Sequence, residues 1–269
     1  MNKTPVLVLV AAGLLCSSAV AEAQFKRSDP ATGEKYNVEV AYGWWRPAPD
    51  IQVSSESLGI PGTVIDFAND FGYEKKKLSE FRLVLRPARK HKFRLDYVPI
   101  KYEVEGAVLR RPIVFNGVTY NVGLPVNTDT TWTTWHFGYE YDFVYRDRGY
   151  VGLLLQAKYT KASITLDSPV NTEFAEAKAP IPAVGIVGRA YPARNVAITG
   201  EFSLFRLLNR EDDNYKAHYY DFDLYATLNF TNNVGVMTGI RSLDVSYTVD
   251  LDYGQLKMKG YYFMGVVRF

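Results

Sequence analysis

The segment WHFGYEYDFVY, residues 135–145, alternates between two kinds of side chain. One set of alternate positions is entirely aromatic: Trp135, Phe137, Tyr139, Tyr141, Phe143 and Tyr145. The intervening positions begin with small or polar residues: His136, Gly138, Glu140 and Asp142. Successive side chains point to opposite faces of a β-strand, so a period of two indicates a strand. The segment therefore predicts a strand with one aromatic face and one polar face.

The same alternation recurs along the chain and predicts ten strands. They cover residues 36–44, 79–86, 92–98, 135–145, 151–166, 183–191, 196–207, 219–230, 234–250 and 256–269. Short turns at 87–91, 146–149, 192–195 and 231–233 alternate with long connections at 46–78, 107–130, 167–181 and 208–217 and a shorter one at 252–255. Turns on one side and long loops on the other are typical of a transmembrane barrel. We expect an all-β, antiparallel up-and-down transmembrane β-barrel of about ten strands, within a range of about eight to twelve.

The N-terminus has the features of a secretory signal peptide. Lys3 precedes an apolar run from Val6 to Leu15, and Ala21-Glu22-Ala23 supplies small residues at the cleavage spacing. We expect residues 1–23 to be a signal peptide cleaved after about Ala23, and residues 24–269 to form one barrel domain. A lipoprotein anchored at Cys16, the chain's one cysteine, is the alternative, but the bulky Leu15 before it disfavours that processing.

Composition excludes little. The formal net charge of +2 gives no reason to expect a nucleic-acid partner. A mean hydropathy of −0.15 resembles that of a soluble protein, but averages mislead when lipid-facing and lumen-facing residues alternate. A soluble β-sandwich or lipocalin-like barrel is therefore an open alternative, in which the apolar face would point inward.

Aromatic residues near the strand ends favour the lipid-facing arrangement. Tyrosine and tryptophan form girdles where a barrel meets the two membrane interfaces. The candidates for such girdles are Trp44, Trp45, Trp132, Trp135, Tyr145, Tyr150, Tyr191, Tyr219, Tyr220 and Tyr261. The opposite face carries charges of both signs, as expected of a narrow lumen.

The chain ends on the amphipathic strand GYYFMGVVRF, residues 260–269. Tyr261, Phe263, Val267 and Phe269 share one face, and Gly265 interrupts it. A closed barrel must pair this last strand with the first to remove its edges.

This ending resembles the terminal β-signal of bacterial outer-membrane β-barrel proteins, although it points to no named subfamily. The resemblance implies that Tyr261, Phe263, Val267 and Phe269 form an assembly signal read by the barrel-assembly machinery. It also implies location in a Gram-negative outer membrane, in contact with lipid and lipopolysaccharide.

Two strands change phase. The apolar parity shifts after Tyr97, where Pro99 precedes Ile100, and again between Ile240 and Leu243. A β-bulge, or a strand leaving the membrane into a rim hairpin, would explain each shift. Asn116-Gly117 between apolar residues separately predicts a tight hairpin over 113–120, above the membrane.

Charged residues on the polar parity are candidates for the barrel lumen. They are Glu39, Glu80, Arg82, Arg94, Asp96, His136, Glu140, Asp142, Lys158, Glu201, Asp221, Asp223 and Arg241. Ten strands enclose a space that side chains largely fill, and isolated buried charges are costly. A network of ion pairs is the expected arrangement, and a thin path for ions or solutes is the alternative.

The histidines do not form a clear catalytic pattern. His218 and Asp221 are three residues apart and therefore lie on opposite faces of a strand, and His136 has only Thr134 as a hydroxyl neighbour on its face. Outer-membrane barrel enzymes, such as omptin-like proteases and lipid A or phospholipid hydrolases, are the alternative class. We expect a small pore or a structural and surface-interaction protein without catalysis, cofactor or metal, with loops 46–78 and 107–130 as the contact surfaces.

Overall fold

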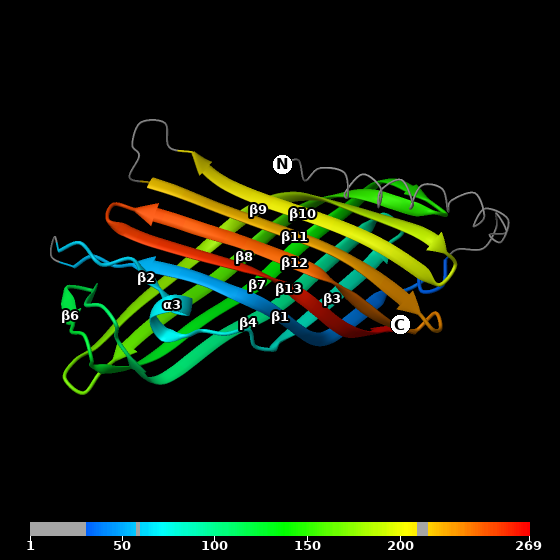
Figure 1. Ribbon diagram of the computed structural model, residues 1–269. Helices are drawn as coiled ribbons and strands as arrows, with labels where there is room; N and C mark the ends of the chain where they lie inside the picture. The colour runs from blue at the N-terminus through cyan, green and yellow to red at the C-terminus, as the bar shows by residue number, and fades with distance from the viewer. Residues whose placement is uncertain (1–30, 58–59, 209–214) are drawn as a thin grey trace, which may run out of the picture.

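The chain forms a closed antiparallel barrel of ten strands, and the part that the structure describes has three further short strands outside the ring (Figure 1). The computed structural model describes residues 31–57, 60–208 and 215–269, so the expected signal peptide lies outside the described part. The ring consists of β1 (Val38–Ser54), β3 (Leu78–Ala88), β4 (His91–Val108), β7 (Pro125–Arg146), β8 (Gly149–Asp167), β9 (Thr172–Ala193), β10 (Val196–Leu208), β11 (Tyr215–Asn229), β12 (Val234–Val249) and β13 (Asp252–Arg268). The expected fold class and strand number are confirmed.

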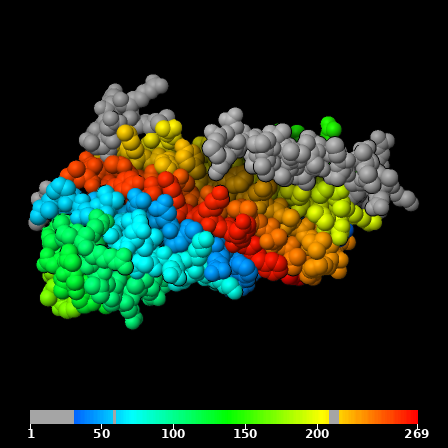
Figure 2. All heavy atoms as spheres, in the orientation of Figure 1, coloured from blue at the N-terminus to red at the C-terminus, as the bar shows by residue number. Residues whose placement is uncertain are grey.

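The ring closes between the two ends of the chain. β1 and β13 pair from Glu39 opposite Arg268 to Ser54 opposite Tyr253. Figure 2 shows the red atoms of β13 lying beside the blue atoms of β1. This β1–β13 seam gives both terminal strands a neighbour on each side, so neither leaves a free edge.

The strands are longer than a membrane crossing requires. β4 has 18 residues, and β7 and β9 have 22 each, whereas about 9–11 residues cross the hydrocarbon. β7 begins at Pro125 and β9 at Thr172, within the segments 107–130 and 167–181 that were expected to be loops. Most of segment 167–181 and the two ends of segment 107–130 are therefore continuations of the barrel wall.

The predicted bulges at the phase changes are wrong. β4 pairs with β7 without a break from His91 to Val104, straight through Pro99, and β12 pairs with both neighbours without a register shift. Inward-facing residues of β4 keep the same parity but change from charged to apolar, from Lys92 and Arg94 to Ile100. The strand keeps its phase, and the chemistry of the interior changes instead.

At the same height along the barrel, the outward-facing residues change from apolar to polar. On β13, outward-facing Phe263 and Tyr261 give way to Lys259 and Lys257. On β4, β8 and β12 the apolar outer residues are likewise followed by Lys101, Lys161 and Asp244. We call the end with the tight turns the turn end and the other the loop end: the turn end is apolar outside, and the loop end is polar outside.

Two connections form a cap at the loop end, which we define as residues 60–76 and 109–124 (Figure 1). The first contains β2 (Ile65–Asp66) and α3 (Phe67–Phe71), and the second contains the hairpin of β5 (Ile113–Phe115) and β6 (Val118–Tyr120). Figure 2 shows their cyan and green atoms gathered at one end of the molecule.

Local signals explain both parts of the cap. The Asp66 carboxylate accepts hydrogen bonds from the backbone N–H groups of Ala68 and Asn69, which caps α3, and Gly72 ends the helix with a left-handed φ of 74°. The hairpin expected at Asn116-Gly117 is confirmed, with φ values of 49° and 79°.

Replacing Gly43 by valine should open the β1–β13 seam. A Cβ atom at this position would lie 2.0 Å from the carbonyl oxygen of Phe263 on β13, so the paired backbones would have to separate. We expect most of the Gly43→Val protein to lose the fast-migrating folded band in unheated gel electrophoresis. Tyr42→Val, which changes an exposed outward residue beside it, is the control. Equal folded fractions in the two variants would contradict this account of the seam.

Candidate functional site

A network of ion pairs fills the lumen near mid-height. Arg241 from β12 binds Asp221 through two nitrogens, at 3.1 and 2.8 Å, and binds Glu80 at 2.7 Å. Lys158 donates to the same Asp221 (3.1 Å). The fork of Arg241 thus ties β12 to β11 and to β3, and a buried charge held this way has its desolvation cost offset by several hydrogen bonds.

Arg82 extends the network to the neighbouring acids. Its guanidinium contacts Glu80 at 2.8 Å and Asp223 at 2.9 Å. Tyr262 on β13 donates its hydroxyl hydrogen to Asp223 (2.9 Å) and places its ring under Arg82, 4.8 Å from the guanidinium carbon.

A second cluster lies closer to the turn end. Glu140 accepts from Lys92 (2.5 Å) and from Arg94 (3.0 Å), while Lys92 also contacts Asp142 (2.9 Å). Arg94 reaches across the lumen to Glu201 on β10 (2.8 Å). β4 and β7 are neighbours in the ring, whereas β10 is separated from them by other strands, so the Arg94–Glu201 contact cross-links the barrel through its interior.

The structure places eleven of the thirteen candidate lumen residues among the buried side chains, and the other two, Asp96 and Glu201, are about 15% and 14% exposed. All thirteen lie on the inward parity of their strands. His136 sits among them, 3.3 Å from the Tyr219 hydroxyl and 3.9 Å from Asp96.

Sequence reasoning missed several members of the interior. Lys92, Arg189 and Arg268 are buried, and Arg268 binds Glu39 across the β1–β13 seam. The alternation of side chains could have identified two of them as inward-facing: Lys92 precedes Arg94 by two residues, and Arg268 alternates with Phe269.

Five of the proposed girdle residues face the inside of the barrel. Trp132 is partly buried there, packs against the apolar core and donates its indole N–H to the Thr134 hydroxyl. The other four, Trp45, Tyr150, Tyr191 and Tyr219, are at most 7% exposed. Each occupies the inward parity, where its ring packs over a cation or its polar atom finds a partner. Lys92, for example, lies 3.6 Å from the centre of the Tyr150 ring, and Lys158 lies 4.0 Å from that of Tyr219.

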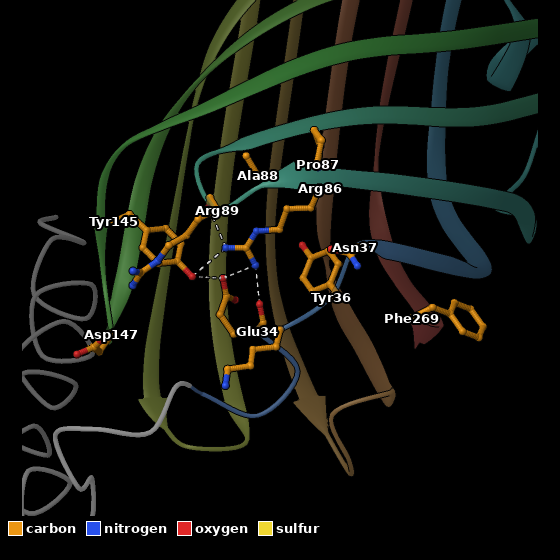
Figure 3. A pocket seen from close by; sticks show the side chains of 11 residues that line it. Glu34, Tyr36, Asn37, Arg86, Pro87, Ala88, Arg89, Tyr145, Asp147 and Phe269 are labelled. Atoms are coloured by element: carbon orange, nitrogen blue, oxygen red, sulfur yellow. Dashed lines mark hydrogen bonds and ion pairs between the residues drawn. The ribbon is translucent and has the colours of Figure 1, made fainter.

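The segment before β1 braces the mouth at the turn end (Figure 3). Glu34 forms an ion pair with Arg86 of β3 (3.1 Å) and accepts hydrogen bonds from Tyr145 of β7 and from Tyr191 of β9. Thr32 donates its backbone N–H to Arg194 in the turn between β9 and β10 (2.8 Å). An open pocket of about 780 Å³ lies beside this brace.

Turn residues on the far side of the mouth hold the same segment. The Asn229 side chain donates to the carbonyl of Thr32 (2.7 Å), and the backbone N–H of Gly33 donates to Asn232 (3.2 Å). Residues 31–37 therefore cross the opening rather than follow its rim.

An apolar core fills the lumen at the loop end. Phe67 and Phe71 of α3 are buried there with Ile113 and Phe115 of β5. Wall residues complete it, among them Ile51, Ile100, Val126, Leu166, Val245 and Leu256.

Two tyrosine hydroxyls of this core, those of Tyr73 and Tyr120, form hydrogen bonds, whereas the hydroxyl of Tyr102 is buried without a partner among the described residues. Tyr73 stacks on Tyr102 at 5.1 Å, and its hydroxyl lies 3.0 and 2.9 Å from the hydroxyls of Thr128 and Thr130. Tyr120 donates its hydroxyl hydrogen to the carbonyl of Leu166 (3.1 Å).

Arg111 joins the two halves of the cap. Its guanidinium donates to both carboxylate oxygens of Asp70, at 2.9 and 2.5 Å, and to the carbonyl of Val64 (2.8 Å). Burial opposes ionisation of Asp70, but the hydrogen bonds from Arg111 and from the backbone of Asp66 hold the pKa of Asp70 below its usual value. This contribution to stability is therefore complete above a pH of about 4 and is lost as the pH falls through the lower folded-state pKa.

Free space between the described charged side chains at mid-height is small. A cavity of about 20 Å³ lies among the charged side chains beside His136 and Asp96, enough for about one water molecule. In the described part of the chain, no cluster of three or more His, Cys, Asp or Glu could hold a metal ion. No helix among the described residues is long and apolar enough to cross a membrane.

Comparison with solved structures places the fold among bacterial outer-membrane barrels. The outer-membrane protease OmpT of Escherichia coli matches with a TM-score of 0.54 at 10% identity, over 91% of this chain and 100% of OmpT. Ail of Yersinia pestis (TM-score 0.36, 11% identity, 84% of this chain and 97% of Ail) and the toluene transporter TodX of Pseudomonas putida (0.36, 7%, 90% and 93%) also match. No family model matches the chain, and no curated protein matches it in sequence.

The chain has the fold of the bacterial outer-membrane β-barrel proteins. This supports an outer-membrane location, whereas cleavage of a signal peptide stays a prediction. A shared fold at 10% identity leaves the activity open.

Removing Arg241 should destabilise the barrel strongly. Arg241→Ala leaves Glu80 and Asp221 with less compensation inside the lumen, and breaking a buried pair on one side costs about 3–5 kcal/mol. We expect that loss in the free energy of unfolding, measured by urea titration in lipid vesicles. Lys161→Ala, which removes an exposed outward cation, should cost no more than about 1 kcal/mol. Similar losses for both variants would show that the lumen network contributes little.

Proposed function

We propose that the protein is a sealed outer-membrane barrel, whose role is to hold a folded surface outside the cell rather than to conduct solutes. The observation that carries this proposal is the continuous filling of the lumen. Residues 31–37 cross the turn-end mouth, ion pairs occupy the middle, and an apolar core occupies the loop end. Of the two roles expected from the sequence, pore and surface-interaction protein, this filling supports the second.

The polarity of the outer wall supports placing the loop end outside the cell. The apolar outer residues of β13 run from Phe269 to Tyr261, a length close to the roughly nine residues that cross the hydrocarbon. The remaining residues up to Asp252 would then stand in water with the cap on top. Short turns on the periplasmic side and long connections outside are the usual arrangement of such barrels.

A basic surface next to the lipid-facing residues fits the proposed lipopolysaccharide partner. Arg46, Lys257 and Lys259 are exposed on neighbouring strands, and Lys77 lies 5.1 Å from the ring of Trp44. Cations directly above an aromatic girdle are suited to the phosphates of anionic lipids. The proposed partners are therefore membrane lipid and lipopolysaccharide, with the barrel-assembly machinery acting on the terminal strand during biogenesis.

Planar-bilayer recordings test the seal. We expect the folded protein to show no regular conductance steps, because side chains of the ion pairs and of the cap occupy the lumen. Insertion is checked on the same vesicles by the heat-dependent shift in gel migration. Reproducible single-channel steps from inserted protein would overturn the proposal.

Cysteine labelling tests which end faces outward. The chain's one cysteine, Cys16, lies in the predicted signal peptide, so single cysteines can be placed on a clean background. A membrane-impermeant maleimide should label Glu105→Cys, at the loop end, on intact cells. It should label Asp147→Cys, at the turn end, only after the outer membrane is permeabilised. The reverse pattern would invert the proposed orientation.

A further inference from the structure

One strand of the ring loses a neighbour at the loop end. β9 pairs with β8 without a register shift over residues 172–190. Its pairing with β10 on the other side ends at Val184 opposite Leu204. Figure 1 shows the yellow-green start of β9 and the yellow end of β10 lying far apart at the loop end. Among the described residues, no strand pairs with this side of residues 172–183, which we call the β9 edge.

Two contacts at the ends of the β8–β9 ladder show which backbone groups point to the β9 edge. The backbone N–H of Ser168 donates to the carbonyl of Asn171 at one end (2.8 Å), and that of Tyr191 donates to the carbonyl of Arg148 at the other (3.0 Å). Hydrogen-bonded and non-hydrogen-bonded pairs alternate along an antiparallel ladder. The odd-numbered residues of β9 therefore bond to β8, and the even-numbered residues turn their N–H and C=O groups toward the β9 edge.

Two prolines explain why β10 separates from β9. Pro180 and Pro182 are even-numbered, so each lacks the N–H that would donate to a neighbouring strand on this side. β10 instead stays paired with β11 as far as Leu208. Beyond the prolines, the four even-numbered residues of segment 172–178 all carry an N–H. The outer part of the β9 edge therefore presents backbone donors and acceptors at the spacing of a strand.

This part of the β9 edge stands clear of the membrane. Val184 and Ile186 are exposed on the apolar outer wall, and Lys178 is the first charged residue beyond them on that face. Lys178 lies six residues past Val184, which corresponds to roughly 15 Å along the barrel axis. The headgroup zone adds only about 5–7 Å to each side of the hydrocarbon core. The backbone groups of segment 172–178 are therefore open to water rather than to lipid.

The outer face of the β9 edge carries an aromatic ring and two opposite charges. Phe174 is 68% exposed. The Lys178 ammonium lies 2.5 Å from the Glu176 carboxylate, and both side chains reach the surface. Opposite charges that face each other across two strands are favourable, and like charges are not. An added strand would therefore place an acid opposite Lys178 and a base opposite Glu176.

The inner face of the β9 edge favours apolar side chains. Ala177 and Ala179 are exposed there, and Ala175 and Ile181 pack against the apolar core of the loop end. Phe205, on the part of β10 that has separated from β9, packs against the same core. An added strand would therefore bury its inward-facing side chains against this core, and apolar residues are suited to those positions.

We propose that the β9 edge binds an extended segment of another protein, which adds a strand to the barrel wall outside the membrane. The segment runs antiparallel to β9 and places an acid, an apolar residue and a base opposite Lys178, Ala177 and Glu176. In such strand addition, main-chain hydrogen bonds give affinity and alternate side chains give specificity. The inference rests on the proposed surface role and names the class of partner for it.

A synthetic peptide tests the β9 edge on the full-length barrel folded in detergent micelles. The peptide Thr-Val-Glu-Val-Lys-Val-Thr-Val-Thr has the required order of charges, and a fluorophore at its N-terminus reports binding by anisotropy. We expect saturable binding to the wild type and at least tenfold weaker binding to Glu176→Pro, because proline removes a donor from the β9 edge but none from the β8 ladder. Glu176→Gln keeps the donor and loses only the charge, so its affinity should fall by no more than about fivefold.

Exchanging the charges tests the register of the added strand. A peptide with its Glu and Lys exchanged should bind the wild type more weakly, and its affinity should recover on the double variant Glu176→Lys, Lys178→Glu. The heat-dependent gel shift confirms that each variant is folded. The proposal is wrong if the folded wild type shows no saturable binding of the first peptide up to about 1 mM, or if Glu176→Pro binds it equally well. These titrations do not depend on conductance or on orientation in the membrane, so this inference and the sealed-barrel function can fail separately.

A second copy of the chain is the competing partner, because Glu176, Ala177 and Lys178 themselves follow the order of acid, apolar residue and base. Antiparallel pairing of two β9 strands would reverse the axis of one barrel, which two copies inserted the same way in one membrane cannot do. The pairing would place Ala177 opposite its own copy. We therefore expect no disulfide-linked dimer from Ala177→Cys under oxidising conditions, and efficient formation of that dimer would overturn the assignment to another protein.

Discussion

The structure depends on one constraint: a strand must meet two different environments along its length while its register stays unbroken. At the turn end the wall is apolar outside and ionic inside, and at the loop end it is polar outside and apolar inside. β13 shows both states, with Phe263 outside and Arg268 inside at one end, and Lys257 outside and Leu256 inside at the other. Because the period of side chains along a strand is two, a slip of one residue would expose every one of these groups to the wrong environment. The inversion therefore fixes the register at both ends of each strand.

The fold could be predicted from this alternation, but the inversion could not be recognised as such. The phase changes after Tyr97 and Ile240 were present in the sequence, and they were attributed either to bulges or to strands that leave the membrane into a rim hairpin. A continuous strand whose two faces exchange polarity was not considered. For the same reason Trp45 and Tyr219 were placed in the membrane girdles, whereas they lie inside. The strands were also predicted too short. A strand segment with a polar outer face, beyond the membrane, resembles a loop in sequence.

The site was predictable only in part for a related reason. The alternation places charged residues such as Arg82 and Asp221 on the inner face of the barrel. It does not predict which residues of different strands meet across the lumen. Arg241 binds Glu80, 161 positions away in sequence, and only the closed ring brings them into contact. The contacts of His218 with Ser246 and Asp244 could not be predicted for the same reason, because these partners lie on the neighbouring strand.

A filled lumen also shifts where activity can be located in such a barrel. Ion pairs that satisfy one another are costly to open, since removing one partner leaves a charge buried without compensation. The ion pairs in the interior of this protein are therefore suited to stability. The inversion creates a different opportunity on the outside. It places a belt of polar side chains directly above the lipid-facing residues, on a rigid sheet whose backbone hydrogen bonds are already made. Side chains on such a sheet keep fixed neighbours at a defined height above the bilayer.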